Sequence, residues 1–451
     1  MTSVKRRIAA NFGASTLGRI LTAIIQIVLV PVMLRHWGAE LYGEWILLST
    51  IPSYMTISDI GFGNAASNEM TMLVAAGKQK EALVVFQSVT LLLGAISVAA
   101  LLLLVLGIWS FPLNAWLHTT PAGLHDMRII LVLLGVSAIL GLQENLFHGS
   151  FQCMGKKALG LMVRNLVVLA VFAGQVVAVE AGANLLETAA VTAALNMAGT
   201  LALWVVLRAK IKWIRYGVRN AHWGTVRRLF KPALAMMSFP IYNVLSLQGI
   251  LLVIGRVSGP IGVVTFNTAR TISRTVFQCF NLINLSIWPE VAAAYGRGSM
   301  ALVRSLHRRA CQAAIFISIF LASALVLFGN QIWKIWTVNK LATDPILLDL
   351  LLLQVLTAAL WYTSSVVPAA TNNHAGIAKV IVFAAVASLL LSYPLMKVDS
   401  LGLRGAAVAL FLGDAFTACF VLRVSLKLSE DNIRDFLKSF LQIPAVVYRR
   451  G

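Results

Sequence analysis

The chain has 451 residues, of which 59% are hydrophobic and 12% are charged, and its formal net charge is +20. Because a soluble domain carries about 25% charged residues, this composition excludes an ordinary water-soluble fold. Apolar runs of about 20 residues, the length of a membrane-spanning helix, recur from Phe12 almost to the C-terminus. These runs lack the alternation of a membrane β-barrel, so the sequence predicts an all-α integral membrane protein.

About twelve spans are predicted by the length of the apolar runs. Lys5, Arg6 and Arg7 precede the first run as in a signal peptide, but the run continues to about Met33 without a small-residue cleavage site. We therefore expect a retained first helix. In chain order, the predicted spans are residues 12–33, 42–62, 84–108, 128–150, 159–180, 187–207, 231–254, 262–288, 311–332, 346–369, 378–396 and 402–423.

The sequence contains neither a metal-binding cysteine pattern nor a phosphate-binding loop. The four cysteines lie in or beside predicted spans without a CxxC pair, and no GxxxxGK[ST] loop is present. We therefore predict no disulfide, no metal site and no cofactor. The cysteines are Cys153, Cys279, Cys311 and Cys419.

The distribution of positive charge predicts the orientation of the chain. With both termini cytoplasmic, 27 of the 37 lysines and arginines lie in inner segments and seven in outer ones. This asymmetry follows the positive-inside rule. Residues 208–230 alternate basic and aromatic side chains, a pattern also found in nucleic-acid-binding segments. A cytoplasmic loop on anionic headgroups explains it as well, so we interpret it as a basic linker and hinge, with no nucleic-acid partner.

An internal repeat with an offset of about 220 residues predicts two halves. Residues 106–113 align with 330–337, which places Trp109 over Trp333, and two further segments align in the same order. Six spans per half is an even number, so the halves should be parallel lobes around a central cavity, as in a carrier. The predicted lobes are residues 1–207 and 231–423, followed by a cytoplasmic tail, 424–451, with an interfacial helix.

The predicted helix 262–288 is amphipathic although it lies within the membrane. Its polar side chains fall within one sector of about 100°, and the opposite side is apolar. An arginine at mid-membrane costs roughly 2.5 to 3.5 kcal/mol, so two of them require a wet cavity, a counter-ion or an anionic ligand. The candidate substrate-binding residues on this face are Asn267, Arg270, Arg274, Gln278 and Asn281, together with Thr271.

Two interpretations of these arginines stay open at the sequence level. Either Arg270 and Arg274 face a substrate, or they form internal salt bridges with Asp59, Glu144, Glu180 or Asp414. Arg19 joins a smaller polar stripe on the first helix and is a further substrate-binding candidate. Because it is shallower, it could instead snorkel to the cytoplasmic face.

Two acidic residues near the cytoplasmic ends of spans are candidates for gating. Asp59 ends the second span, and Glu144 lies in the fourth with His148 one helical turn later. They could form a gate or a proton relay, or a salt bridge that closes the inner ends.

Residues 38–48, GAELYGEWILL, lead into ISDIGFGNAASNE at 57–69. This stretch resembles the opening of bacterial O-antigen (Wzx-type) polysaccharide flippases, of the multidrug, oligosaccharidyl-lipid and polysaccharide exporter superfamily. The resemblance implies transfer of an undecaprenyl-diphosphate-linked oligosaccharide from the cytoplasmic to the periplasmic leaflet of the bacterial inner membrane by alternating access. It also implies a cationic cavity, supplied here by Arg270 and Arg274. Membrane lipids, a polysaccharide polymerase and chain-length machinery would be partners, and the chain would not be an enzyme.

Two other functions compete with this interpretation. A cation-coupled multidrug exporter of the same superfamily would resemble its relatives by an acidic residue deep in the first or seventh span, and neither span has one. A membrane glycan polymerase or ligase would need catalytic groups in a sizeable outer loop. The longest outer loop offers His118, His125 and Asp126, without paired carboxylates at catalytic spacing.

Overall fold

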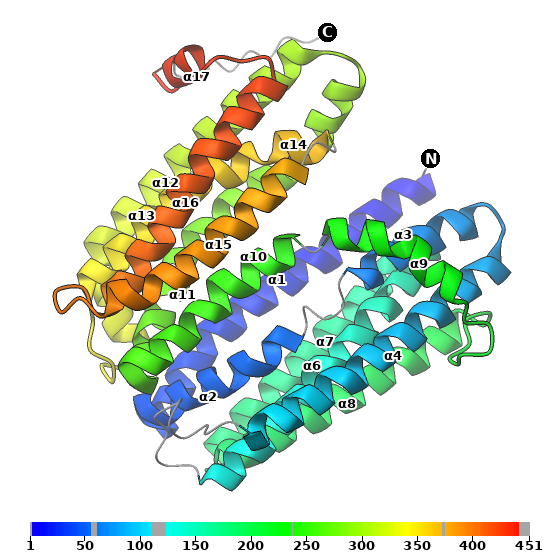
Figure 1. Ribbon diagram of the computed structural model, residues 1–451, viewed down its shortest axis with the longest axis horizontal. Coiled ribbons are helices and arrows are strands. Elements are labelled where there is room, and N and C mark those ends of the chain that lie inside the picture. Colours follow the sequence, from blue (N-terminus) through cyan, green and yellow to red (C-terminus); the bar gives the residue numbers. More distant parts are fainter. Residues whose placement is uncertain (1, 56–60, 111–122, 237, 372–374, 442–451) are drawn as a thin grey trace. The chain divides into compact units, whose positions relative to one another are not determined.

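The structure is a computed structural model that describes residues 2–55, 61–110, 123–236, 238–371 and 375–441. Within these ranges every regular element is a helix and none is a strand (Figure 1). Ten helical segments are long and apolar enough to cross a bilayer. The prediction of an all-α membrane fold is confirmed.

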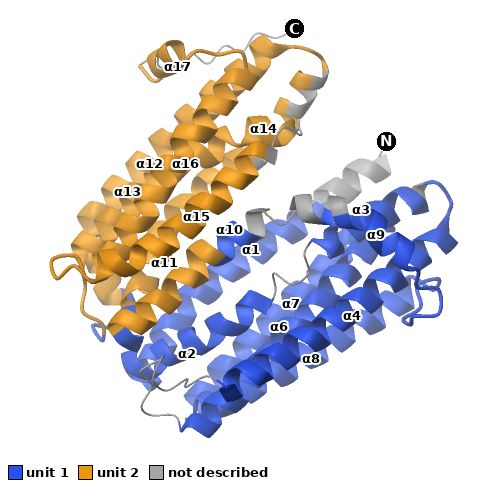
Figure 2. Ribbon diagram, in the orientation of Figure 1, with its two compact units in different colours: residues 1–244, 259–264, 336–340 blue, residues 245–258, 265–335, 341–451 orange. Residues whose placement is uncertain are grey.

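The chain divides into two compact units (Figure 2). Unit 1 comprises Met1–Val244, Gly259–Val264 and Trp336–Lys340, and unit 2 comprises the remaining residues. Residues 231–244 therefore lie in unit 1, whereas the sequence analysis counts them with the second lobe. The exact limits of the two predicted lobes stay a prediction.

Unit 1 consists of long helices joined by short turns. A capping box begins α8, since the Asn184 side chain accepts from the Glu187 amide and the Glu187 carboxylate accepts from the Asn184 amide. The helices of this unit are α1 (Thr2–His36), α2 (Gly38–Ser53), α3 (Phe62–Ala75), α4 (Gln79–Ser110), α6 (Leu124–Cys153), α7 (Lys157–Glu180), α8 (Leu185–Lys210), α9 (Trp223–Met236) and α10 (Ser238–Val244).

An aromatic cluster joins the linker of unit 1 to its helices. The ring of Trp204 on α8 lies 5.4 Å from that of Phe147 on α6 and 5.3 Å from that of Tyr216 in the linker. Rings at these separations attract each other beyond the effect of their buried area. The linker therefore packs on the end of α6 and α8.

Hydrogen bonds also attach the linker to α4. The buried side-chain amide of Gln87 donates to the Arg215 carbonyl at 3.0 Å and accepts from the Asn220 amide at 2.8 Å. The Ser88 hydroxyl accepts from the His222 amide at 2.8 Å. Residues 211–222, part of the predicted linker 208–230, are thus attached to helices of unit 1, and the hinge role of the linker stays a prediction.

Unit 2 is a second set of long helices. Its α13 begins with Asp344 as cap, whose carboxylate accepts from the Leu347 amide at 3.1 Å and from Arg404 at 3.1 Å. The elements that lie wholly or mainly in this unit are the π-helix η2 (Leu245–Gly249), α11 (Ile250–Gly296), α12 (Met300–Trp336), α13 (Pro345–Ser364), α14 (Val366–Ala370), α15 (Ala375–Met396), α16 (Leu403–Leu428) and α17 (Ile433–Ser439).

Two features account for the difference between twelve predicted spans and ten long segments. Gly259 interrupts α11 with φ 67° and ψ −173°, a conformation that suits glycine and separates the predicted spans 231–254 and 262–288. The predicted span 42–62 contains α2, which ends at Ser53, and residues 56–60 lie outside the described part. Counting these separately restores about twelve spans.

The short helix α17 is fixed to α12. Phe436 is 1% exposed and its ring stacks on that of His307, with centroids 5.4 Å apart. Arg308 forms a two-point ion pair with Asp431, in which Nε lies 2.7 Å from Oδ2. A short helix is therefore present in the predicted tail, its interfacial position stays a prediction, and residues 442–451 lie outside the described ranges.

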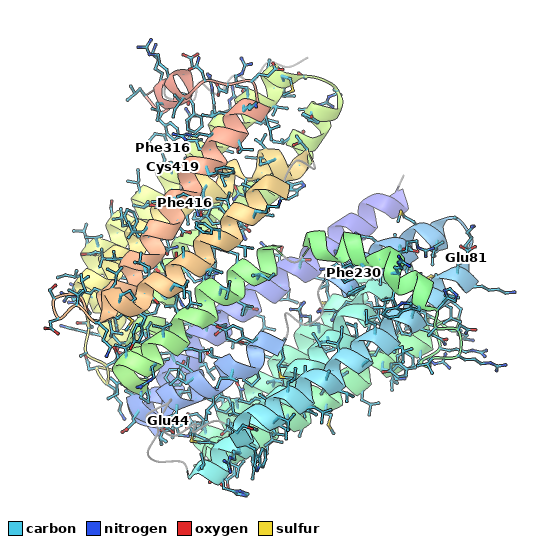
Figure 3. All side chains as sticks on the ribbon, viewed as in Figure 1. Glu44, Glu81, Phe230, Phe316, Phe416 and Cys419 are labelled. Atoms are coloured by element: carbon cyan, nitrogen blue, oxygen red, sulfur yellow. The ribbon has the colours of Figure 1, made fainter. Side chains whose placement is uncertain are left out.

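The outer surface of the helices is apolar, as a bilayer requires. Phe316 on α12 and Phe416 on α16, both labelled on unit 2 in Figure 3, are each about half exposed. Many leucines, isoleucines and valines of both units are exposed in the same way. In water such a surface would be unfavourable. Together with the ten long apolar segments, it identifies a multi-pass membrane protein.

Candidate functional site

The helix after Gly259 has the two faces that the sequence predicts. Ala269, Ile272, Val276 and Phe280 form the apolar face and are at most 4% exposed. The polar face is half-buried at Asn267, Arg270, Thr271, Arg274 and Asn281, and exposed at Gln278. Packing of the apolar face therefore orients the polar face away from the core of unit 2.

Arg270 is held by two neutral oxygen atoms. Its Nη1 donates to the Leu247 carbonyl at 2.5 Å, and its Nη2 donates to Asn267 Oδ1 at 2.8 Å. The guanidinium also lies 5.9 Å from the ring centroid of Phe266. These contacts position the arginine, but neither oxygen carries a charge that would cancel its own.

Leu247 belongs to the π-helix η2, which the sequence analysis does not predict. π-helical turns are rare and frequently occur at functional sites. Here the turn brings a backbone carbonyl to Arg270, 23 residues further along the chain. The π-helix has no marker in the sequence that could have revealed it.

Arg274 lies one helical turn from Arg270 on the same face. Its guanidinium lies 5.2 Å from the ring centroid of Phe277, and the Phe277 ring lies 5.0 Å from that of Tyr362 on α13. Attraction between a guanidinium and an aromatic face adds about 0.5 to 1 kcal/mol at exposed sites and more in a dry environment. A neighbouring helix therefore supports the position of the second arginine.

The sequence analysis missed Asn284 on the same helix. This residue is 4% exposed, and among the described residues neither its Oδ1 nor its Nδ2 has a hydrogen-bond partner. A buried amide without partners is costly, so such a group is commonly satisfied by an ordered water or a ligand. It lies one turn beyond Phe280, just outside the polar sector. Because its neighbours in the sequence are apolar, the helical periodicity does not assign it to the polar face.

Arg19 belongs to unit 1, whereas Arg270 and Arg274 belong to unit 2. It is exposed. On the adjoining positions α1 packs against α7, because Asn165 Nδ2 donates to the Ala14 carbonyl at 3.0 Å and Gly18 leaves no room for a side chain against Asn165. Whether Arg19 meets a substrate or the membrane surface stays a prediction.

The acidic residues considered as partners of the arginines have other described partners. Glu144 accepts from the Thr200 hydroxyl at 2.5 Å, Glu180 lies 3.3 Å from His36, and Asp414 accepts from the Gln354 amide. Asp59 lies outside the described residues. The gating role of Glu144 and Asp59 stays a prediction.

Comparison with known proteins gives structures but no sequence relatives. No protein-family model and no curated protein matches the chain. A multidrug resistance MATE family transporter of the MOP superfamily, in an inward-facing conformation, superposes with a TM-score of 0.74 at 15% identity, over 95% of this chain and 96% of that one. The lipid II flippase MurJ, in an inward closed conformation, gives 0.69 at 15% identity, over 96% and 90%.

A third similar structure is a MOP superfamily transporter from Pyrococcus furiosus, described by a binding pocket of reverse polarity that suggests a different function. It gives a TM-score of 0.55 at 14% identity, over 97% of this chain and 95% of that one. Identities this low show the fold alone. The chain has the all-helical MATE- and MurJ-like fold, which agrees with the predicted architecture.

Proposed function

We propose that the chain is a flippase that moves an undecaprenyl-diphosphate-linked oligosaccharide from the cytoplasmic to the periplasmic leaflet by alternating access. The observation that carries this proposal is the arginine pair on one face of α11. Arg270 is positioned by the Leu247 carbonyl and by Asn267, two neutral acceptors. A positive charge fixed in this way in a membrane-spanning helix suits an anionic ligand.

The chemistry of arginine matches a diphosphate. A guanidinium presents planar pairs of N–H donors that fit two phosphate oxygens, and such charge-assisted bonds are about twice as strong as neutral ones. Arg270 and Arg274 are four residues apart, a rise of about 6 Å along the helix. In the proposed function each guanidinium binds one phosphate of the diphosphate, while Asn267, Gln278 and Asn281 bind the adjoining polar groups.

Membrane potential could drive this transfer without ATP. Each charge that crosses the membrane changes the free energy by roughly 2.3 kcal/mol per 100 mV. A diphosphate diester carries two negative charges, so its outward movement from a negative-inside cell gains about 4.6 kcal/mol at 100 mV. In this role the chain lies in the bacterial inner membrane with both termini cytoplasmic, and its product passes to a polysaccharide polymerase and chain-length machinery.

The similar structures support a lipid substrate without defining it. MurJ is a lipid II flippase, the MATE protein is a multidrug transporter, and the Pyrococcus protein has a pocket of reverse polarity. Proteins with this fold therefore transport different substrates, and we expect the charge of the substrate-binding residues to select among them. Two arginines on α11 favour an anionic lipid over an organic cation.

The test replaces both arginines by alanine in a cell that assembles a lipid-linked glycan. We expect Arg270→Ala with Arg274→Ala to abolish the appearance of glycan on the outer leaflet, with normal amounts of folded protein in the membrane. Arg270→Lys with Arg274→Lys should retain part of the transport, because the positive charges remain. Transport should be below wild type, because lysine lacks the paired N–H donors of the guanidinium. Arg297→Ala, at an exposed site after the end of α11, is the matched control.

Full transport by the correctly inserted double-alanine variant would contradict the assignment of these residues. Resistance to organic cations, conferred by the wild type and abolished by the double-alanine variant, would instead establish a multidrug exporter. Glycan transport and drug resistance should therefore be measured on the same four proteins.

A further inference from the structure

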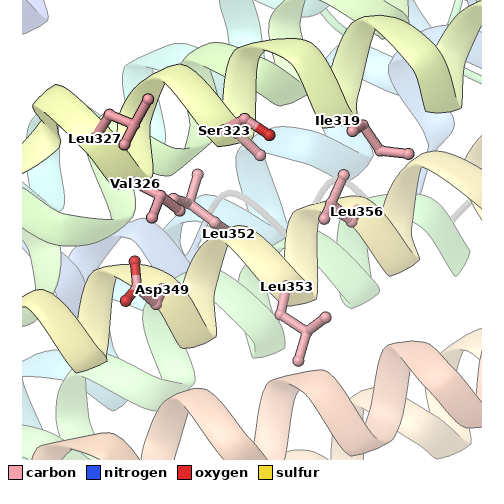
Figure 4. A pocket seen from close by; sticks show the side chains of 9 residues that line it. Ile319, Ser323, Val326, Leu327, Asp349, Leu352, Leu353 and Leu356 are labelled. Carbon is pink, nitrogen blue, oxygen red and sulfur yellow. The ribbon is translucent and has the colours of Figure 1, made fainter.

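A groove lies between α12 and α13 on unit 2 (Figure 4). Its volume is about 430 Å³. The floor is made by Ala322 and Leu352, which are 5% and 2% exposed, while Leu327 and Ile319 on the rim are 67% and 47% exposed. The groove is deep at Ala322 because this side chain is small. The apolar side chains of the rim are exposed on the surface that would face lipid.

The two polar groups of the groove occupy defined positions along it. Asp349 lies at one end next to Val326, Ser323 lies near the middle, and Ile319 and Leu356 lie at the other end (Figure 4). From Asp349 to Leu356 the groove follows α13 for seven residues, a distance of about 10 Å at about 1.5 Å per residue. The groove therefore has a carboxylate at one end and is apolar along most of its remaining length.

The depth of the carboxylate follows from the predicted topology, in which α13 begins at the outer side of the membrane. Asp349 is four residues after Pro345, where α13 begins, so it lies about 6 Å from the end of the helix. The headgroup layer on each side of a bilayer is about 5 to 7 Å thick. With the start of α13 at the outer surface, we expect Asp349 level with the headgroups and the apolar part of the groove beneath it, toward the bilayer centre.

We propose that this groove binds one phospholipid with a primary ammonium headgroup, such as phosphatidylethanolamine. The ammonium donates to the Asp349 carboxylate, and one acyl chain lies along Ala322, Leu352 and Ile319. The Ser323 hydroxyl, one helical turn deeper than Leu327, donates to an ester oxygen of the same lipid. By the positive-inside rule the bound lipid belongs to the outer leaflet.

Charge complementarity selects this occupant over other lipids. An ionised carboxylate is an acceptor only, so it pairs with a cation that carries N–H donors. A primary ammonium has three such donors, whereas a quaternary choline has none. An anionic headgroup would be repelled by the carboxylate, and an apolar chain alone would leave the carboxylate beside lipid without a partner from the ligand.

The test uses the full-length protein in nanodiscs that contain equal amounts of phosphatidylethanolamine and phosphatidylcholine with identical acyl chains. Native mass spectrometry counts the lipids that stay bound after release. We expect the wild type to retain one ethanolamine lipid in preference to choline lipid by about fivefold, the upper range for a partly exposed ion pair. Asp349→Asn should remove the preference, and Asp399→Asn, at an exposed acid outside the groove, should keep it.

A second pair of variants tests the apolar part. Ala322→Leu fills the floor and should reduce the count by one lipid of either headgroup, whereas Ala301→Leu, at an exposed site on the same helix, should not. If Ala322→Leu does not fold, Ser323→Leu fills the groove from its exposed side with the same expected loss. An unchanged preference in Asp349→Asn, or an unchanged lipid count in a folded groove-filling variant, would overturn the proposal.

Discussion

Arg19 in unit 1 and Arg270 in unit 2 are both arginines within membrane-spanning helices, but their surroundings differ. Arg19 is exposed, next to the site where Gly18 packs against Asn165. Arg270 is half-buried and donates to the Leu247 carbonyl and to Asn267. The Arg19 side chain is exposed, whereas the Arg270 side chain is positioned by two hydrogen bonds.

This difference separates two ways of tolerating a charge in a membrane. A flexible arginine reduces its cost by extending toward water, so its location in the sequence says little about function. A positioned arginine has lost that option, and its cost has to be met by a ligand, a counter-ion or a wet cavity. Transport should therefore be far more sensitive to Arg270 than to Arg19.

The largest effect is expected for Arg270→Ala alone. Loss of its charge-assisted bonds to a phosphate should lower the rate of glycan transfer by about 10- to 100-fold. The rate should be measured as the appearance of glycan on the outer leaflet, normalised to folded protein. A transfer rate within twofold of wild type would contradict the expectation that Arg270 matters more for transport than Arg19.

An intermediate effect is expected for Asn267→Ala, which leaves both charges in place. The Arg270 guanidinium would lose one of its two neutral acceptors and with it part of its fixed position. A hydrogen bond contributes about 0.5 to 1.5 kcal/mol net, so its loss should lower the rate of glycan transfer by about two- to tenfold. The same transfer assay applies, with Gln79→Ala, at an exposed amide at the start of α4, as the control. An effect larger than that of Arg270→Ala would show that Asn267 binds substrate by itself.

The smallest effect is expected for Arg19→Ala. Because Arg19 is exposed, its removal should lower the transfer rate by less than about threefold, the range of an exposed ion pair. Arg19→Lys, which keeps the charge, is the control. A loss as large as that of Arg270→Ala, restored by lysine, would instead place Arg19 in the substrate-binding site.

The polar face of α11 could be predicted because helical periodicity is a local property of the sequence. The same pattern that aligns Arg270 with Arg274 also places Ile272, Val276 and Phe280 on the face that the structure buries. The break between two spans could be predicted as well, since the apolar runs stop on either side of Gly259. These features follow from residues a few positions apart.

The supports of the site could not be predicted, because they come from distant or unmarked segments. The Leu247 carbonyl is available through a π-helical turn, and Tyr362 approaches Phe277 from α13, 85 positions later in the sequence. Backbone carbonyls have no sequence signature at all. The attachment of the linker could not be predicted for a similar reason, since Gln87 and Ser88, which bind it, occur in an otherwise apolar run.

The bound linker also bears on the order in which the chain folds. Its partners lie on α4, α6 and α8, so every residue of this contact is among the first 222. A chain is synthesised from its N-terminus, and N-terminal domains generally fold first. The residues that make these contacts are therefore synthesised before α11, so the attachment of the linker does not depend on the arginine-bearing helix.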